Sequence, residues 1–412
     1  MSILIILIVI LLGIVTERGI KKTFPKFSSL HRKGIHRSFI ILSAVSVAIM
    51  LCGGLFARHI SDYRLVARYY FFFGGVAALY ISKSVYAMFL FVDWMIPAIC
   101  KRCGSHAGQF RRIFLKCGFL TGVVTIFLMV WSILFGRYNY TVDHVEIAFN
   151  NLPPSFDGFK IVQISDVHAG SFSGSADCFQ KAVDMINMQE PNLIVMTGDM
   201  VNNFGEETIA VIPIFSQLNA RDGKYAVLGN HDYGGYFKWK SPEDSVANHK
   251  AISGYIEQMG FVLLNNQSAV ISNNNSGSIA LIGTEGWGKE KKRPKLGNLE
   301  KAMEPVRDIP FKILLAHDPS FWHEKVKGKT DIMLTLSGHT HGMQIGVKLG
   351  KKRYSFGLLR GYRYLAGLYQ KNRQYLYVNR GLGVIGFPGR IGMSPEITVI
   401  TLRKDTIFIQ SI

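Results

Sequence analysis

The residues best suited to chemistry in this chain are histidine, aspartate and asparagine side chains gathered in five short motifs. The motifs are Asp166-Val167-His168, Gly198-Asp199, Gly229-Asn230-His231-Asp232, His317 and Gly338-His339-Thr340-His341. Their imidazole, carboxylate and amide groups are ligands for divalent metals of borderline hardness, and none of the motifs contains the soft ligand cysteine. A lone histidine after a strand is usually an ordinary hydrogen-bonded residue. Five such motifs together predict a site for Mn, Fe or Zn.

Each motif directly follows a short apolar run that is typical of a buried strand. The runs are Phe159–Ile164, Asn192–Met196, Lys224–Leu228, Phe311–Ala316 and Asp331–Leu336, with further runs at Phe261–Leu264 and Ile279–Ile282. Helical segments separate several of them, which indicates an α/β architecture. Ligands of such sheets bind at the carboxyl edge of the strands, so we expect the five motifs to meet there. Two later runs, Gln374–Asn379 and Ile397–Leu402, have no helix between them and predict antiparallel strands.

From about Phe159 to Leu402 the sequence resembles the calcineurin-like metallophosphoesterases, and most closely their membrane-anchored bacterial subgroup. The resemblance rests on the five motifs, on the segment Leu336–Gln344, which reads L-S-G-H-T-H-G-x-Q, and on Tyr377–Gly383, which reads Y-V-N-R-G-L-G. It implies a four-layer α/β/β/α sandwich with two divalent metal ions at the strand ends. It also implies hydrolysis of phosphoester or pyrophosphate bonds by a metal-activated hydroxide.

The resemblance further implies a role for each motif residue. Asp166, His168 and His341 would hold one metal ion, Asn230, His317 and His339 would hold the other, and Asp199 would bridge the two. His231 would stabilise the transition state or protonate the leaving oxygen, a task that suits a group with a pKa near neutrality. Asp232 would orient His231 or a metal-bound histidine, although a turn residue before Gly234 is an equal alternative.

Five positions depart from the family pattern or have an open role. Asn202 and Asn203 stand where the family often has a further acid and an arginine, which disfavours the substrates of protein Ser/Thr phosphatases. Met343 replaces a second glycine common in the subgroup. Arg380 and Arg390 could line a phosphate pocket or a membrane-facing rim.

The first 136 residues differ in composition from the rest. Four apolar stretches, Ser2–Val15, Ser38–Ala57, Tyr69–Ile99 and Ile113–Gly136, predict about four transmembrane helices, the first of them short. We therefore expect a transmembrane helical region at 1–136, a linker and entry strand at 137–158, and a catalytic domain at 159–412. Lys83 and Asp93 lie within the third stretch, where a transport path is the alternative to snorkelling or to a break between two shorter segments.

The basic charge of the chain is concentrated near the predicted spans. Residues 1–136 carry 16 Lys and Arg against 3 acids, and the remainder carries 31 against 25, out of a total formal charge of +19. Charge of this kind beside apolar spans is typical of membrane proteins, and we expect no nucleic-acid partner. Cys100 and Cys103 form an isolated C-x-x-C pair, for which a metal or redox role is the less favoured interpretation. The sequence does not predict an oligomeric state.

The distribution of positive charge also predicts an orientation. The first and third inter-helix loops are richer in Lys and Arg than the second, so by the positive-inside rule they face the cytoplasm. Four spans then predict a multi-pass protein of the cell membrane with an extracytoplasmic catalytic domain. Membrane anchoring makes a lipid-linked phosphoester an economical substrate hypothesis. The alternative is a transporter or sensor whose metallophosphoesterase-like domain binds a ligand without catalysis, and a nuclease ranks lower.

Overall fold

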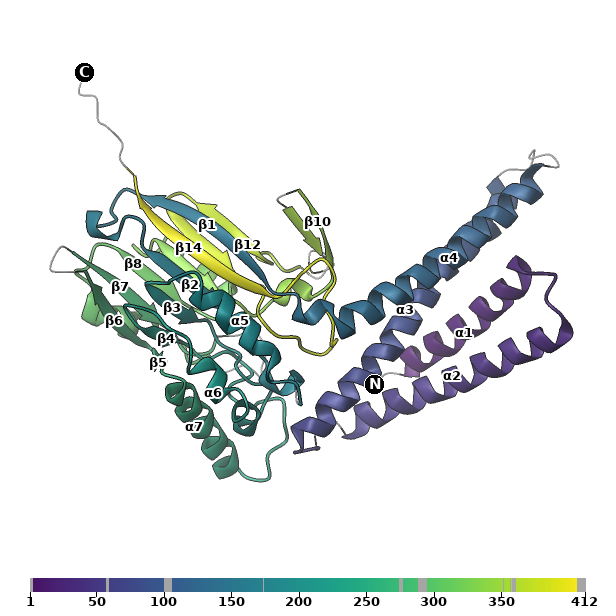
Figure 1. Cartoon of the computed structure of the whole chain (residues 1–412), viewed down its shortest axis with the longest axis horizontal. Helices are drawn as coiled ribbons and strands as arrows, with labels where there is room; N and C mark the ends of the chain where they lie inside the picture. Colours follow the sequence, from purple (N-terminus) through teal and green to yellow (C-terminus); the bar gives the residue numbers. More distant parts are fainter. Residues whose placement is uncertain are drawn as a thin grey trace, which may run out of the picture. The chain divides into compact units, whose positions relative to one another are not determined.

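The structure is a computed structural model that describes residues 3–56, 59–99, 106–172, 174–273, 277–287, 295–350, 352–355, 357 and 361–405. The chain divides into two compact units (Figure 1). The helical unit comprises Met1–Ile60, Arg68–Phe135 and Phe387–Gly389. The sheet unit comprises Ser61–Ala67, Gly136–Gly386 and Arg390–Ile412. Cys100 and Cys103 and most of the basic run at 289–295 lie outside the described residues.

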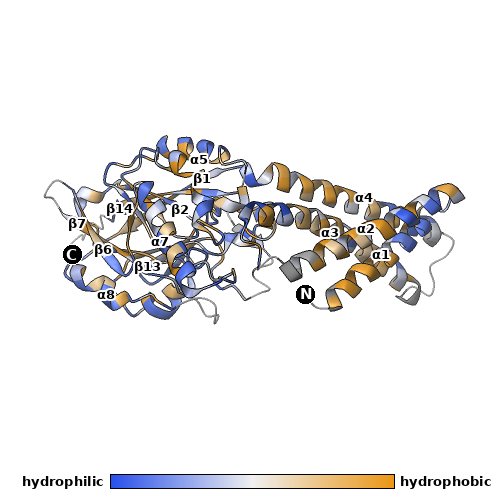
Figure 2. Cartoon of the chain, turned by 90° about the horizontal axis from the view of Figure 1, so that it is seen from below, coloured by the Kyte–Doolittle hydropathy of each residue, from blue (hydrophilic) through white to orange (hydrophobic). Residues whose placement is uncertain are grey.

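The helical unit is built from long apolar helices. They are Ile3–Thr23 (α1), Ser29–Phe56 (α2), Tyr63–Ile99 (α3) and His106–Leu134 (α4). Three segments are long and apolar enough to cross a membrane, namely Ser29–Leu51, Tyr63–Ile96 and Gly108–Tyr138. Apolar residues cover much of the surface of these helices, as Figure 2 shows. The predicted first span forms α1, which has 21 residues but carries Glu17 and several basic residues in its second half.

The ionisable residues of the third stretch have partners inside the helical unit. Asp93 is fully buried, and its carboxylate pairs with Arg111 of α4 at 2.8 Å and with Lys22 of α1. Lys83 is buried with its Nζ 4.5 Å from the centroid of the Tyr80 ring. Because α3 is one continuous helix of 37 residues, neither residue marks a break between two shorter segments. Contacts with protein groups are what ionisable side chains in apolar helices require.

The sheet unit contains two six-stranded sheets. The first has the order β1-β14-β2-β3-β4-β5, with strands Thr141–Phe149 (β1), Glu396–Lys404 (β14), Lys160–Ile164 (β2), Leu193–Met196 (β3), Lys224–Ala226 (β4) and Val262–Leu263 (β5). The second has the order β12-β13-β9-β8-β7-β6, with strands Gly367–Lys371 (β12), Gln374–Val378 (β13), Leu334–Ser337 (β9), Lys312–Leu315 (β8), Ser278–Gly283 (β7) and Gln267–Ser272 (β6). Gly346–Leu349 (β10) and Lys352–Ser355 (β11) form a separate hairpin.

The sheets are mixed, with parallel strands at the centre. Strands β2 to β5 are parallel to one another, and so are β7, β8, β9 and β13. The two late strands differ from the prediction, because each has one antiparallel and one parallel neighbour: β13 lies between β12 and β9, and β14 lies between β2 and β1. The β6 and β12 strands were not expected, since their half-exposed, polar sequences lack a continuous apolar run.

Helices cover the outer faces of both sheets, which gives the predicted four layers (Figure 1). The helices are Cys178–Asn187 (α5), Ile212–Phe215 (α6), Pro242–Gln258 (α7) and Leu299–Met303 (α8). Short helical turns occupy Gly136–Tyr138, Pro154–Phe156, Ala169–Phe172, Gly205–Thr208, Glu304–Val306, Trp322–Val326 and His341–Met343. The turns at Ala169–Phe172 and His341–Met343 directly follow two of the motifs.

Side-chain alternation along the strands builds the layers. In β3, Leu193 and Val195 enter the apolar core between the two sheets, whereas Ile194 and Met196 pack under the helices of the first sheet. The β8 strand repeats the pattern with Leu314 on its outer, helix-covered face. Successive residues of a strand point to opposite faces, so a strand buried on both faces must be apolar throughout. This explains why the strands that end in motifs are short, continuous apolar runs.

A buried glutamate joins two loops at the carboxyl edge of the first sheet. Glu207 Oε2 accepts hydrogen bonds from the backbone N–H groups of Gly170 at 3.1 Å and Asn202 at 2.6 Å. Its Oε1 accepts from Asn203 and Phe204, each at 2.9 Å. Burial raises the pKa of Glu207 to about 7, although the four donors act in the opposite direction. One carboxylate therefore fixes the loop after β2 relative to the loop after β3.

We predict that Glu207→Gln lowers the melting temperature of the full chain. In the variant, the amide NH2 group replaces one carboxylate oxygen, so two of the four backbone N–H donors lose their acceptor. Each buried donor left unpaired costs about 1–3 kcal/mol. A carboxyl whose folded-state pKa lies above its ordinary value of 4.5 binds its proton more tightly in the folded state, so its contribution to stability falls as the pH rises from about 4.5 to 7. The difference in melting temperature between wild type and variant should therefore become smaller as the pH rises across this range. A difference in melting temperature that grows with pH would contradict the raised pKa of Glu207.

Candidate active site

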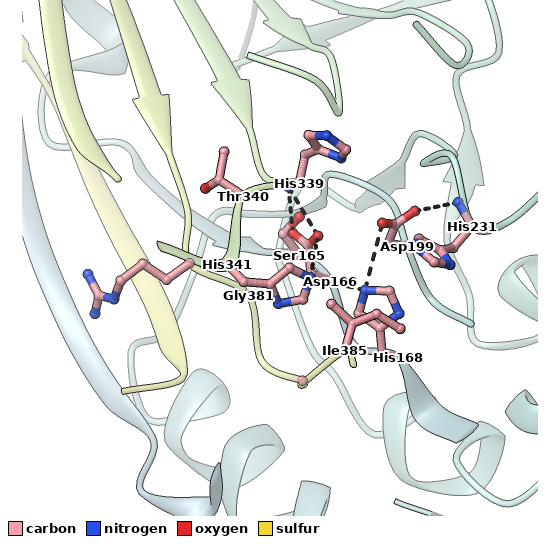
Figure 3. Close-up of polar contacts among 12 residues, drawn as sticks. Ser165, Asp166, His168, Asp199, His231, His339, Thr340, His341, Gly381 and Ile385 are labelled. Carbon is pink, nitrogen blue, oxygen red and sulfur yellow. Dashed lines mark hydrogen bonds and ion pairs between the residues drawn. The ribbon is translucent and has the colours of Figure 1, made fainter. Parts of the chain in front are cut away.

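The five motifs lie at the carboxyl ends of five parallel strands, three in the first sheet and two in the second. Asp166 and His168 follow β2, Asp199 follows β3, and Asn230 with His231 follow β4. His317 follows β8, while His339 and His341 follow β9. The two edges meet, because His317 Nε2 from the second sheet lies 3.1 Å from Asp199 Oδ2 in the first. Figure 3 shows side chains from both sheets converging on one point.

The converging residues form two groups of potential metal ligands. The first group is Asp166, His168 and His341, and the second is Asp199, His317 and His339. Within each group the ligand atoms lie within 4.8 Å of one another. The grouping has the same division as the ligand sets implied by the family resemblance, and Asp199 connects the groups. Its Oδ2 is 3.1 Å from His317 Nε2 of its own group and 3.7 Å from His168 Nε2 of the other.

Asn230 is the remaining residue expected among the ligands. Its Oδ1 is buried and has no hydrogen-bond partner among the described residues. The neighbouring backbone approaches Asp199 closely: the N–H of His231 donates to Asp199 Oδ1 at 2.8 Å, and a Cβ on Gly229 would lie 2.2 Å from that oxygen. A buried amide oxygen without a donor is costly in an apolar interior. An orphaned acceptor beside Asp199 fits a cation at this place.

Hydrogen bonds from the histidines to nearby oxygens orient the imidazole rings. His168 Nδ1 lies 3.0 Å from Asn202 Oδ1, and His317 Nδ1 lies 2.7 Å from the carbonyl oxygen of Thr197. Since a carbonyl oxygen can only accept, each of these Nδ1 atoms carries a proton, and Nε2 of the neutral His168 ring carries a lone pair. His168 Nε2 faces His341 Nε2 at 3.1 Å, and His317 Nε2 faces His339 Nδ1 at 3.2 Å. The guanidinium of Arg390 contacts His341 Nδ1 at 3.3 Å and can only donate, so His341 Nε2 carries the hydrogen that points toward His168. A bound cation would take the place of such a hydrogen.

Burial and neighbouring charges set the protonation states. Burial, together with nearby His231, lowers the pKa of His168 to about 3, and burial likewise holds the pKa of His341 well below its ordinary value. Burial would raise the pKa of Asp199, but His317 and His231 hold it well below the usual range. Burial would lower the pKa of His317, but Asp199 raises it to about 10. The first group thus offers neutral imidazoles, whereas the second pairs an ionised carboxylate with a protonated imidazole, whose proton a metal ion would displace.

Five of the candidate ligands have a left-handed backbone. Their φ angles are 49° at Asp166, 46° at His168, 57° at Asp199, 73° at His339 and 52° at His341. This conformation costs about 1–2 kcal/mol for a residue with a Cβ and persists only where the surroundings enforce it. Each strand ends in a tight turn that points its side chain back across the edge. Non-glycine residues with positive φ are common at functional sites, and half of the ten among the described residues belong to the motifs.

Glycines in the motifs allow the backbones of the two sheets to approach. A Cβ on Gly338 would lie 1.9 Å from Ser165 Oγ and 2.3 Å from Asp166 Oδ2, a distance that no side chain tolerates. The close approach lets the N–H of His339 donate to both oxygens of Asp166, at 3.0 and 2.9 Å (Figure 3). The glycine before the histidine is therefore required by the position of Asp166.

The structure gives Asp232 a role that differs from both sequence interpretations. Its Oδ2 accepts from the N–H groups of Asp199 and Gly229, both at 2.8 Å, and its Oδ1 accepts from Met200 at 2.9 Å and Val201 at 3.2 Å. Its carboxylate thus holds the backbone of the Asp199 loop instead of orienting a histidine ring. The ring of His231 is instead oriented by Asn202, whose carbonyl oxygen accepts from Nδ1 at 2.7 Å.

Two further sequence expectations require correction or addition. Arg380 and Arg390 are fully buried and do not line a phosphate pocket. Arg380 pairs with Glu396 at 2.7 Å and Asp143 at 3.0 Å, and Arg390 donates to backbone carbonyls, including that of Arg380 at 2.7 Å. Asn202, noted only as a departure from the family pattern, contacts His168 and His231. Its position three residues after Asp199 was the available signal, but its two contacts depend on loop geometry.

Comparison with known proteins gives the family. Residues 159–343 match the model of the calcineurin-like phosphoesterases. The metallophosphoesterase YkuE of Bacillus subtilis is 34% identical over 274 residues, which are 64% of this chain and 85% of that protein. A transmembrane protein with a metallophosphoesterase domain from Bos taurus is 31% identical over 323 residues.

The coverage of these relatives varies. The Bos taurus alignment includes 73% of this chain and 66% of the relative, so this chain spans about two thirds of that protein. The phosphodiesterase YaeI of Escherichia coli is 28% identical over 246 residues, which are 59% of this chain and 82% of YaeI. The matched model and the alignment with YkuE, at 34% identity over 85% of that protein, show that the chain belongs to the calcineurin-like phosphoesterase family and is a metal-dependent phosphoesterase.

Proposed function

We propose that this chain is a membrane-anchored phosphoesterase that binds two divalent metal ions and hydrolyses phosphoester or pyrophosphate bonds. The observation that carries the proposal is the convergence of two donor groups on Asp199, 3.1 Å from one histidine nitrogen and 3.7 Å from another. A carboxylate shared between two groups of ligands suits a pair of ions held roughly 3.5–4 Å apart, as in binuclear hydrolases.

The ligand assignment is part of the proposal. Asp166, His168 and His341 would hold one ion, Asn230, His317 and His339 would hold the second, and Asp199 would contact both. Bound ions of this kind supply Lewis acidity, which activates water near neutral pH and offsets the charge of phosphate oxygens. Histidine, carboxylate and amide ligands favour Mn, Fe or Zn.

His231 is the proposed proton donor to the leaving oxygen. Its Nδ1–H donates to the carbonyl oxygen of Asn202 at 2.7 Å, so the exchangeable nitrogen is Nε2. Its backbone N–H donates to Asp199 Oδ1, which places the imidazole beside the shared carboxylate. The ring is 4.9 Å from that of His168, centroid to centroid, and nearly perpendicular to it. Proton donation by a positioned histidine makes a poor alkoxide leaving group a better one.

The helical unit supports a lipid-linked substrate. Three segments long and apolar enough to cross a membrane precede the catalytic strands in the same chain, and a relative from Bos taurus is named for the same combination. An enzyme fixed to a bilayer meets a lipid phosphoester or lipid pyrophosphate at a higher local concentration than a dilute soluble ester. We therefore favour a substrate whose phosphate is carried by a lipid.

The distribution of positive charge supports an extracytoplasmic catalytic domain. The segments between the first and second and between the third and fourth apolar stretches of the sequence are the more basic ones, which the positive-inside rule assigns to the cytoplasm. This orientation requires α1 to span the bilayer. Its 21 residues extend about 31 Å at 1.5 Å per residue, close to the thickness of the hydrocarbon core.

The first test is hydrolysis of bis-p-nitrophenyl phosphate and p-nitrophenyl phosphate by the detergent-solubilised full chain, stripped of metal and reloaded with Mn²⁺. We expect turnover that requires the metal and that Asp199→Asn abolishes together with the binding of one or both ions. The matched variant His231→Gln should retain both ions, measured as metal content, and lose about 10²–10⁴ in kcat. A fully loaded wild type with no turnover on any ester would contradict the proposed catalysis.

A second test addresses the lipid-linked substrate. In nanodiscs that contain the full chain, phosphate release from phosphatidic acid should have a higher kcat/KM than phosphate release from glycerol 3-phosphate. Likewise, kcat/KM for a polyisoprenyl diphosphate should be higher than kcat/KM for inorganic pyrophosphate. We expect this preference because enzyme and lipid substrate share one bilayer. Dilution of both into detergent micelles should therefore remove the difference in kcat/KM. Equal values for each lipid and its soluble counterpart in nanodiscs would show that the lipid part is not recognised.

A third test addresses the side of the membrane. Val270 lies on the edge strand β6 and is 51% exposed, so a cysteine placed there should react readily. In intact cells, a membrane-impermeant maleimide should label Val270→Cys above the level of the parent chain. Labelling that occurs only after lysis would place the catalytic domain in the cytoplasm.

A further inference from the structure

Tyr236 is a half-buried residue in the loop between β4 and α7, five positions after His231. It belongs to none of the five motifs, and it contacts two motif residues. The phenol hydroxyl contacts Asn230, and the ring contacts His231. One side chain thus touches a proposed metal ligand and the proposed proton donor.

The hydroxyl of Tyr236 holds the nitrogen end of the Asn230 amide. Asn230 Nδ2 donates to Tyr236 Oη at 2.9 Å, whereas Asn230 Oδ1 is buried without a hydrogen-bond partner among the described residues. An asparagine amide has a donor end and an acceptor end, and rotation by 180° exchanges them. In the rotated state the NH2 group would face the cation, which no metal ligand set accepts. The hydrogen bond to Tyr236 therefore favours the orientation in which the oxygen is available.

The ring of Tyr236 fixes the plane of the His231 imidazole. The two rings are stacked, with centroids 4.3 Å apart and an interplanar angle of 19°. The hydrogen bond from His231 Nδ1 to Asn202 fixes one atom of the ring, but it leaves rotation about the bond direction open. Contact with the Tyr236 face on one side and the edge-on approach of His168 restrict that rotation. Both contacts therefore restrict the direction in which Nε2 points.

We propose that Tyr236 is a positioning residue with two separable functions: its hydroxyl presents Asn230 Oδ1 to a metal ion, and its ring aligns His231 for proton transfer. The first function concerns metal binding alone, whereas the second rests on the proposed catalytic role of His231. Tyr236→Phe removes the first function and keeps the second, while Tyr236→Leu removes both.

Metal binding tests the hydroxyl. Mn²⁺ binding isotherms of the metal-stripped, detergent-solubilised full chain should show two sites in the wild type. In Tyr236→Phe, one site should weaken about 10- to 100-fold, the range for loss of a group that orients a metal ligand, and the other should keep its affinity. Unchanged affinity at both sites would overturn this part of the proposal.

Tyr233→Phe is a matched control for that measurement. Tyr233 lies in the same loop, stacks on His249 at 4.8 Å and accepts a hydrogen bond from the N–H of Gly286 at 3.0 Å. It differs from Tyr236 in that its partners are not proposed metal ligands. Loss of the Tyr233 hydroxyl should therefore leave both Mn²⁺ affinities unchanged. An equal loss of Mn²⁺ affinity in Tyr233→Phe and Tyr236→Phe would assign the effect to loop stability and overturn the proposal.

Turnover at saturating Mn²⁺ tests the ring. With both sites loaded, Tyr236→Leu should have a kcat about threefold to tenfold below that of Tyr236→Phe, the effect expected from loss of one aromatic pair, with a similar KM. Equal kcat values would overturn the role of the ring and leave that of the hydroxyl. A fully loaded wild type without turnover would refute the proposed function, yet the isotherms would still decide the role of the hydroxyl. If Tyr236→Leu does not fold, Tyr236→Met, which also lacks an aromatic face, replaces it and should show the same lower kcat relative to Tyr236→Phe.

Discussion

The structure of the site depends on pairs of imidazole nitrogens that face each other at short range. His168 Nε2 and His341 Nε2 are 3.1 Å apart, and His317 Nε2 and His339 Nδ1 are 3.2 Å apart. At such distances a hydrogen or a cation lies between the two nitrogens, since two facing lone pairs repel. Asp199 lies beside both pairs and supplies the negative charge. The arrangement thus suits cations, and the backbone turns that hold it carry a cost in strain.

The rest of the fold supports this costly arrangement. The left-handed turns at five of the motif residues store strain, and backbone hydrogen bonds hold those turns in place. Asp232 accepts from four N–H groups around the Asp199 loop, and Glu207 accepts from four others in the loops after β2 and β3. These carboxylates touch no proposed ligand side chain, so their contribution is to the position of the backbone. Continuous apolar strands behind the loops provide the rigid base.

Much of the fold and the site could be predicted from the sequence, because both depend on local patterns. The apolar runs before Asp166, Asp199 and His317 gave strands within three residues of their observed ends, and the motifs at their ends identified the residues that converge. The strands β6 and β12 could not be predicted, since a half-exposed edge strand carries no continuous apolar signal. The roles of Asp232 and Asn202 depend on which backbone groups a loop brings near, which no spacing encodes. The burial of Arg380 likewise depends on its ion pairs with Glu396 and with Asp143, which is distant in sequence, and the burial of Arg390 depends on carbonyls that a loop brings near.

The internal pairing of Arg380 and Arg390 affects how the site responds to anions. Both guanidinium groups are buried and hydrogen-bonded inside the protein, Arg380 to carboxylates and Arg390 to carbonyls and His341 Nδ1, so neither is exposed to donate to a bound phosphate. More of the attraction for the anion then comes from the cations themselves. Two ligands that stabilise each other in this way are thermodynamically linked, and the linkage is reciprocal. Phosphate, the product, should therefore tighten the binding of metal to this enzyme by the same factor by which metal tightens the binding of phosphate, so that product inhibition and metal retention rise together.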